Sequence, residues 1–166
     1  MYLTTEELQR IEKVAIKDTI LPQYRNAANW FLFCCYTGLR YSDAFAFTTN
    51  KIVNNRIVLR TQKTGSNVSI ALHPKLKIVI NRLGDNLTTN QDYNRNLKAV
   101  AALAKINKPI TSHIARYSFA VHFLDYGGSM EVLSKLLAHE KISTTQLYGK
   151  ITDLKVDAEM GKVWGK

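Results

Sequence analysis

Four short polar segments contain residue types that could together act on a phosphodiester. They lie at residues 37–43, 62–65, 112–120 and 137–148. Together they supply two arginines, a lysine, two histidines and a tyrosine, namely Arg40, Arg116, Lys63, His113, His139 and Tyr148. An arginine side chain can bind two phosphoryl oxygens at once and stays charged. A tyrosine oxygen can attack phosphorus and hold the phosphate covalently. If these side chains meet, the sequence predicts covalent chemistry on a phosphate ester.

Taken one at a time, these residues also have ordinary structural explanations. Arg40 could pair with Asp43, three residues later, and Lys63 could be an exposed lysine in a tight turn. His113 and Arg116 could be an exposed pair on one helix face. His139 could be a hydrogen-bonded core histidine, and Tyr148 could be a surface tyrosine. The chemical interpretation therefore depends on the whole set and on its order along the chain.

Other phosphate chemistries lack their sequence signatures. There is no pair of carboxylates of the kind that holds Mg²⁺ in two-metal nucleases, and there is no Walker A loop or G-x-G-x-x-G motif. The only two cysteines, Cys34 and Cys35, are adjacent in an apolar run and form no metal-ligand motif. They indicate reduced core thiols in a cytoplasmic protein.

The positive charge is concentrated in the middle of the chain. The 166 residues have a formal net charge of +10. Residues 51–116 contain twelve lysines and arginines against two aspartates, whereas the rest of the chain has eleven basic and eleven acidic residues. This segregation favours binding to a polyanion. A membrane surface is disfavoured as the partner, because the basic residues do not follow one amphipathic helix.

The first third of the chain has the patterns of helices that would position the first segment. Residues 4–7 match a capping box, and apolar residues follow them at helical spacing as far as Ile16. Pro22 is suited to the first turn of a second helix, which we expect to end at Gly38. A short third helix is predicted from about residue 40.

The pattern then changes to short β-strands and returns to helices. Alternating β-branched residues predict a three-stranded antiparallel sheet with turns at residues 54–55 and 65–67, its strands at 52–53, 56–60 and 68–72. Ser112 and Ser129 are predicted helix N-caps. Further helices are expected at residues 74–84, 90–106, 112–126, 129–138, 143–148 and 153–163. The fold class is therefore α+β, mainly helical, with one small sheet at the edge, in a single domain over residues 1–166.

At the polar segments the sequence resembles the tyrosine recombinase (phage integrase) family, specifically its C-terminal catalytic domain. The T-G-L-R box matches residues 37–40 with an acidic residue at Asp43, and the family's β-turn lysine matches Lys63. The H-x-x-R box matches residues 113–116, and the histidine-to-tyrosine box matches residues 137–148. The resemblance covers the whole chain and implies the fold of that catalytic domain. It also implies that the family's N-terminal core-binding domain is absent from this chain.

The resemblance implies a role for each basic residue and for the tyrosine. Tyr148 attacks the scissile phosphate and forms a 3′-phosphotyrosyl link, while Arg40 and Arg116 stabilise the charge on the non-bridging oxygens. Lys63 gives a proton to the departing 5′-oxygen, and His113 accepts the proton of the tyrosine. His139 donates a hydrogen bond to the phosphate. Asp43 is expected to orient Arg40 or His113. No metal ion or cofactor is implied.

Two small departures from the family pattern are expected to be harmless. Ala138 stands where the family has glycine, and we expect a helical conformation there that tolerates alanine. Tyr117 stands where a histidine is frequent, and it removes no principal catalytic group.

The resemblance also implies the partners. They are double-stranded DNA, further copies of the chain in a tetramer on DNA, and accessory DNA-bending or directionality factors. The amphipathic tail of residues 153–164 is expected to dock on a neighbouring protomer, with packing on its own domain as the alternative.

The function predicted from the sequence is site-specific recombination that integrates or excises a mobile element. One alternative uses the same chemistry, namely a type IB topoisomerase-like activity, and a second is of a different class, namely a catalytically silent DNA-binding module. A metal-dependent nuclease would differ from all three in being inhibited by EDTA. No signal peptide or membrane-spanning run is recognised.

Overall fold

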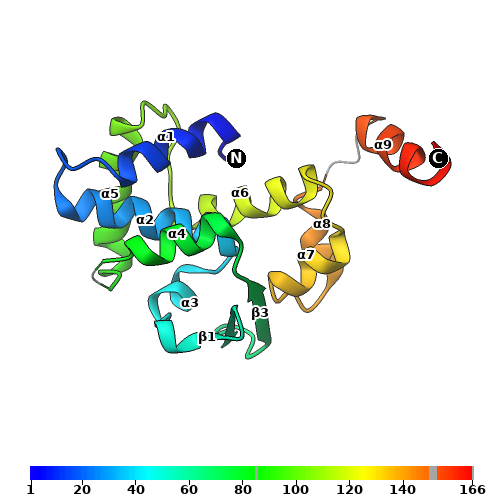
Figure 1. Cartoon of the computed structure of the whole chain (residues 1–166), viewed down its shortest axis with the longest axis horizontal. Coiled ribbons are helices and arrows are strands. Elements are labelled where there is room, and N and C mark those ends of the chain that lie inside the picture. Colours follow the sequence, from blue (N-terminus) through cyan, green and yellow to red (C-terminus); the bar gives the residue numbers. More distant parts are fainter. Residues whose placement is uncertain (85, 150–152, 166) are drawn as a thin grey trace.

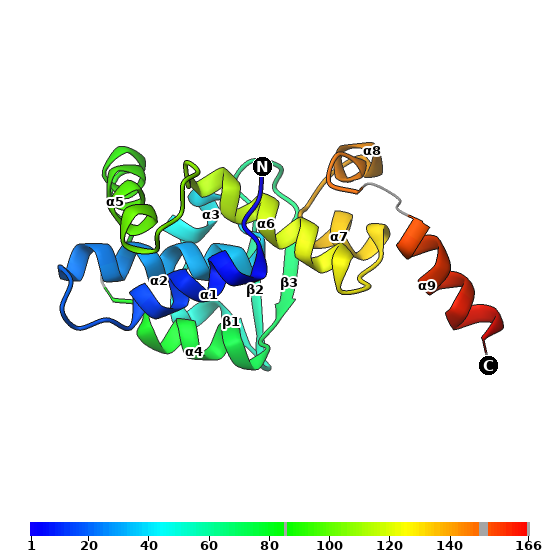
Figure 2. The same ribbon diagram turned by 90° about the horizontal axis from the view of Figure 1, so that it is seen from above.

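Helix α2 (Pro22–Thr37) is the element around which the other long helices pack. The computed structural model describes residues 1–84, 86–149 and 153–165. Most of α2 is apolar and buried on all sides, and it contacts α1 (Thr5–Ala15), α4 (Pro74–Arg82), α5 (Asn90–Leu103) and α6 (Ser112–Asp125). Figures 1 and 2 show these helices gathered around α2. Among the described residues, no helix is long and apolar enough to cross a membrane.

The start of α1 confirms the predicted capping box. The Thr4 hydroxyl accepts a hydrogen bond from the Glu7 amide, and the Glu7 carboxylate accepts one from the Thr4 amide at 2.8 Å. This exchange satisfies two amides that a helix N-terminus otherwise leaves without partners. The helix ends at Ala15, and Ile16 is the residue that caps it.

The short strands form the predicted antiparallel sheet, which lies below the helices in Figure 1. Its order is β1 (Ile52–Val53), β2 (Arg56–Arg60) and β3 (Asn67–Ala71), and buried and exposed residues alternate along β2 and β3. Asn54 and Asn55 have positive φ angles of 49° and 60° in the turn between β1 and β2. Asparagine tolerates this conformation better than most residues, which explains the tight hairpin. In the sequence, α2 is followed by α3 (Tyr41–Phe45) and then by a short 3₁₀ turn, η1 (Thr49–Lys51), which leads into the sheet.

The C-terminal helices are α7 (Met130–Leu136), α8 (Ile142–Gln146) and α9 (Asp153–Trp164). The Ser129 hydroxyl accepts a hydrogen bond from the Val132 amide, which confirms Ser129 as an N-cap. The prediction for Ser112 is wrong by one residue. Thr111 is the N-cap of α6, and Ser112 is already helical. Helix α9 projects away from the rest of the molecule in Figures 1 and 2.

The hydrophobic interior is divided into two clusters of unequal size. The larger one holds α1, α2, the sheet, α4, α5 and the first turn of α6. The smaller one joins the second half of α6 to α7, and its buried members are Ala120, Leu124, Leu133 and Leu137. The Tyr148 ring packs against this smaller cluster. The predicted α+β class, mainly helical with a three-stranded sheet, is confirmed.

Candidate active site

Arg116 is held between the ends of two helices. Its Nη1 donates to the carbonyl of Gly38 at 2.7 Å, and its Nη2 donates to the carbonyl of Leu137 at 2.7 Å. These carbonyls lie just past the C-terminal ends of α2 and α7, where helix dipoles favour a positive charge. Only 7% of Arg116 is exposed. The fold therefore fixes this guanidinium before any ligand arrives.

Gly38 is needed at the end of α2 for two reasons. Its φ angle of 71° is left-handed, a conformation that L-residues other than glycine adopt at a cost. A Cβ atom at this position would also lie 2.5 Å from Cδ1 of Phe119 on α6. The glycine of the T-G-L-R segment thus allows α2 to end close against α6, where its carbonyl meets Arg116.

His139 follows α7 and faces Arg116. Its Nε2 lies 3.1 Å from Nη2 of Arg116, and its Nδ1 lies 2.8 Å from the Thr145 hydroxyl. Burial, together with the positive charges of Arg116 and Arg40, lowers the pKa of His139 to about 4. The imidazole is therefore neutral at physiological pH.

The residue before His139 corrects one expectation from the sequence. Ala138 is not helical, because its φ angle is 50° and α7 has already ended at Leu136. The amide of Ala138 donates to the carbonyl of Lys135, and the amide of His139 donates to that of Ser134 at 3.0 Å. This is a Schellman motif, in which glycine is the favoured residue at the left-handed position. Alanine therefore carries backbone strain here.

Ala138→Gly is expected to lower the free energy of unfolding much less than the same change at a buried helical alanine. Both variants lose one buried methyl group, but only the change at Ala138 relieves the left-handed strain of about 1–2 kcal/mol. Ala28 in α2 is the matched control, because it is fully buried and right-handed. Urea unfolding should show Ala138→Gly to be about 1–2 kcal/mol more stable than Ala28→Gly. Equal losses of stability would contradict this assignment of strain.

Tyr148 follows α8 and lies against His139. The two rings are stacked, with centroids 6.1 Å apart and planes 11° apart. Tyr117 of α6 packs its ring edge-to-face with Tyr148 at 5.0 Å between centroids. Because Nε2 of His139 lies 3.1 Å from Nη2 of Arg116, the stacked Tyr148 ring lies beside the residue that contacts the fixed guanidinium.

Arg40 brings a second guanidinium to the same place. It is the N-cap residue of α3, and its buried Nη1 has no hydrogen-bond partner among the described residues. Burial lowers the pKa of Arg116 to about 10, and repulsion from Arg40 contributes to the shift. Two arginines this close, one with an unsatisfied nitrogen, favour an anion between them.

Asp43 is anchored to the turn that carries Lys63. Its Oδ1 accepts a hydrogen bond from the Gln62 amide at 2.8 Å, and the residue is 3% exposed. The sequence interpretation gave Asp43 the partners Arg40 or His113. The described hydrogen bond instead joins α3 to the β2–β3 turn, one residue before Lys63.

Lys63 itself is exposed in a turn that is internally well bonded. The hydroxyl groups of Thr61 and Thr64 lie 2.8 Å apart, and Nε of Arg60 donates to the carbonyl of Gly65 at 2.7 Å. His113 is exposed on α6, three residues before Arg116. Neither Lys63 nor His113 makes a hydrogen bond to another described side chain. The structure thus gathers Arg40, Arg116, His139 and Tyr148, and places the other two on adjoining elements.

Comparison with known proteins identifies the family of this chain. A family model described as the phage integrase family matches residues 1–155. The chain belongs to the phage integrase family. It is 40% identical over 79 residues to tyrosine recombinase XerD of Listeria monocytogenes, an alignment covering 48% of this chain and 26% of that protein. It is 30% identical over 123 residues to the integrase of Escherichia phage P2, covering 70% of this chain and 35% of that one. The chain thus spans 26–35% of the length of these relatives.

Solved structures of recombinases share the fold of this phage integrase chain. The XerA recombinase has a TM-score of 0.75 at 19% identity, covering 100% of this chain and 66% of that one. The catalytic domain of bacteriophage HP1 integrase has a TM-score of 0.71 at 20% identity, covering 98% of this chain and 94% of that one. At such identities the likeness establishes the fold.

Two contacts of the phage integrase site were not predicted from the sequence. Thr145 hydrogen-bonds to His139, and Tyr117 packs on Tyr148. The sequence signal for Thr145 is its place in the histidine-to-tyrosine box, three residues before Tyr148. The signal for Tyr117 is its position beside Arg116 in the H-x-x-R segment.

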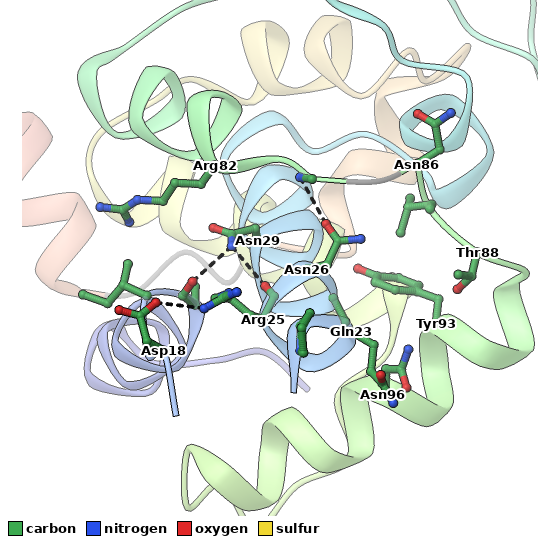
Figure 3. Close-up of a pocket in the computed structure, with 16 residues that line it drawn as sticks. Asp18, Gln23, Arg25, Asn26, Asn29, Arg82, Asn86, Thr88, Tyr93 and Asn96 are labelled. Atoms are coloured by element: carbon green, nitrogen blue, oxygen red, sulfur yellow. Dashed lines mark hydrogen bonds and ion pairs between the residues drawn. The ribbon is translucent and has the colours of Figure 1, made fainter. Parts of the chain in front are cut away.

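A cavity of about 860 Å³ lies away from the candidate site, at the N-terminal end of α2 (Figure 3). Its polar lining consists largely of amide side chains beside Tyr93, among them Gln23, Asn26, Asn29, Asn86 and Asn96. None of the six predicted site residues lines it. The candidate active site of the phage integrase chain therefore lies outside this cavity.

Proposed function

We propose that this chain is the catalytic domain of a site-specific DNA recombinase. It cleaves and rejoins double-stranded DNA through a 3′-phosphotyrosyl intermediate and serves the integration or excision of a mobile element. The observation that carries the proposal is the stacking of the Tyr148 ring on His139, whose Nε2 lies 3.1 Å from Nη2 of Arg116. Membership of the phage integrase family supports it.

The reaction follows from the charges and atoms of this cluster. The Tyr148 oxygen attacks phosphorus, and the bond from phosphorus to the 5′-oxygen breaks. His113 accepts the phenolic proton, and Lys63 gives a proton to the departing 5′-oxygen. Arg40 and Arg116 stabilise the negative charge that grows on the non-bridging oxygens. Attack of a second 5′-hydroxyl on the phosphotyrosine reverses the sequence, so phosphoester bonds are exchanged without an external energy source.

Covalent trapping tests this proposal. The substrate is a pool of duplexes with randomised arms and a nick near the cleavage position. Cleavage then releases a short fragment that carries the free 5′-hydroxyl, so the reverse reaction cannot occur and the adduct accumulates. Because the domain alone is expected to bind DNA with a Kd in the 10⁻⁴–10⁻⁶ M range of non-specific complexes, the protein is used above that range. We expect a protein–DNA adduct on Tyr148 that forms equally well with EDTA. Loss of the adduct in EDTA would instead indicate a metal-dependent nuclease.

The same material distinguishes the remaining alternatives. A topoisomerase-like enzyme would relax supercoiled plasmid without exchanging strands between two duplexes. A silent DNA-binding module would shift the mobility of duplex DNA and give no adduct. We also propose the cytoplasm as the compartment, which fits the two buried free thiols of Cys34 and Cys35.

We further propose that copies of the chain assemble into a tetramer on DNA through α9. The side chains of residues 156–165 are exposed, and Val156, Met160, Val163 and Trp164 are spaced to lie on one helix face. An apolar face on a helix that projects from its own domain favours docking on a neighbouring copy over packing in place.

Deleting the chain after Gly149 is expected to leave the melting temperature nearly unchanged and to lower the multimer fraction on DNA. The matched control is Leu21→Asp, which places a charge on another exposed apolar residue at the opposite end of the domain. Mass photometry of the protein on duplex DNA measures the multimers, and adduct yield measures cleavage. If the deletion changes neither quantity, the tail does not dock on a neighbour.

A further inference from the structure

Thr145 occupies a central place in the candidate site although no catalytic role falls to it. It is fully buried, in the last turn of α8. Its hydroxyl lies 2.8 Å from Nδ1 of His139, and its carbonyl accepts a hydrogen bond from the Tyr148 amide at 3.0 Å. One residue thus contacts both the histidine ring and the backbone of the nucleophile.

The donors around His139 assign its proton. The guanidinium of Arg116 has only N–H groups and cannot accept a hydrogen bond, so Nε2 of His139 must be the acceptor in their 3.1 Å contact. The neutral ring then carries its single proton on Nδ1, which donates to the Thr145 hydroxyl. This assignment comes from the hydrogen-bond network, as histidine tautomers ordinarily do.

This tautomer is the wrong one for donation to a phosphate from Nε2. The ring could gain that ability by taking up a second proton or by moving its proton from Nδ1 to Nε2. Burial and the charges of Arg116 and Arg40 oppose the second proton, because they lower the pKa of His139 to about 4. A change of tautomer keeps the ring neutral, and it needs a partner for Nδ1 that can donate as well as accept.

A hydroxyl group is such a partner, because it holds one proton and two lone pairs. We propose that Thr145 is a positioning residue whose hydroxyl lets neutral His139 alternate between accepting from Arg116 and donating to the scissile phosphate. In the second state the Thr145 hydroxyl rotates and donates to Nδ1. Nδ1 gives one proton to solvent and Nε2 takes one from solvent, to which the half-buried ring has access, so the charge of the site does not change.

The proposal rests on the proposed recombinase function only in taking the scissile DNA phosphate as the acceptor for His139. Its first test does not require the chain to cleave DNA. Long-range ¹H–¹⁵N NMR spectra of the DNA-free chain report the tautomer of His139 directly. We expect the Nδ1–H form in the unchanged chain and in Thr145→Ser, and a mixture of forms in Thr145→Val, which keeps the shape without the hydroxyl. Nicked duplex DNA, added to a Tyr148→Phe chain, should move the ring to the neutral Nε2–H form. An Nε2–H form without DNA, or an imidazolium with it, would overturn the proposal.

The second test is a double-mutant cycle on the rate of adduct formation. Loss of a residue that orients a catalytic group typically costs 10–100-fold, so Thr145→Val should slow cleavage by about that factor and Thr145→Ser by only a few-fold. Thr144→Val is the matched control, because it makes the same change at the exposed neighbouring residue.

The cycle separates positioning from a structural role. Added to His139→Gln, Thr145→Val should slow the reaction little further, because its effect passes through the missing imidazole. An equal further loss in that background, with a lowered melting temperature, would show that Thr145 only supports the fold. If the unchanged chain forms no adduct, the recombinase function fails, and the NMR test still decides the proposal for Thr145.

Discussion

Tyr148→Phe is expected to retain DNA binding and to form no covalent adduct. The substitution removes only the phenolic oxygen and keeps the ring that stacks on His139 and packs against Tyr117. Removal of a nucleophile from other enzymes with covalent intermediates lowers kcat by about 10⁶-fold, which places the remaining reaction below detection in a trapping assay. Mobility shift at low salt measures binding, and denaturing gels measure the adduct.

Tyr117→Phe is the matched control for this variant. The Tyr117 ring is in contact with the Tyr148 ring, so a displaced nucleophile would be found there first. Tyr126 is 75% exposed, and its hydroxyl lies 3.1 Å from that of Thr5. Mass spectrometry of the trapped peptide should place the DNA on Tyr148. An adduct on Tyr117 or Tyr126 would show that the nucleophile is wrongly assigned.

Lys63→Ala is expected to slow cleavage by about 10²–10⁴-fold, the usual contribution of a general acid. The 5′-alkoxide is a poor leaving group, and the exposed position of Lys63 in its turn allows it to reach a bound duplex. A substrate with sulfur in place of the bridging 5′-oxygen has a leaving group that needs no proton. On that substrate the defect of Lys63→Ala should largely disappear.

Two further variants serve as controls for the rescue of cleavage by the substrate with a bridging 5′-sulfur. Arg40→Ala should stay impaired on the sulfur substrate, because Arg40 acts on the non-bridging oxygens rather than on the leaving group. Lys51→Ala removes another exposed lysine of the basic segment and should cleave both substrates at nearly the normal rate. If sulfur restores Arg40→Ala and leaves Lys63→Ala slow, the two roles have been exchanged.

The features of the fold that could be predicted are those determined by residues close in sequence. The capping box depends on Thr4 and Glu7, and the first hairpin depends on Asn54 and Asn55, so each pattern contains both partners of its interaction. The burial of α2 follows from its continuous apolar run. The order of the four polar segments was likewise visible, although their meeting in space was an expectation from resemblance.

The features that could not be predicted depend on partners far apart in sequence. The hydrogen bond of Asp43 goes to Gln62, nineteen residues away, and no local pattern distinguishes that partner from Arg40. The helix preceding His139 ends two residues earlier than its apolar pattern suggests, which puts Ala138 in a left-handed conformation. Thr145 lies in the histidine-to-tyrosine box, but its contact with the ring of His139, six residues earlier, is seen only in the structure.

The division of the interior into two clusters has a consequence for how the site is assembled. The Arg40 segment, with the buried Leu39 and Ala44, belongs to the larger cluster, while the Tyr148 ring belongs to the small one between α6 and α7. Arg116 joins them by donating to one carbonyl from each side. A unit with four buried apolar residues can open locally at a far lower free energy than the whole domain unfolds. A bound phosphate that contacts residues of both clusters is therefore expected to favour the arrangement in which Tyr148 lies beside the arginines.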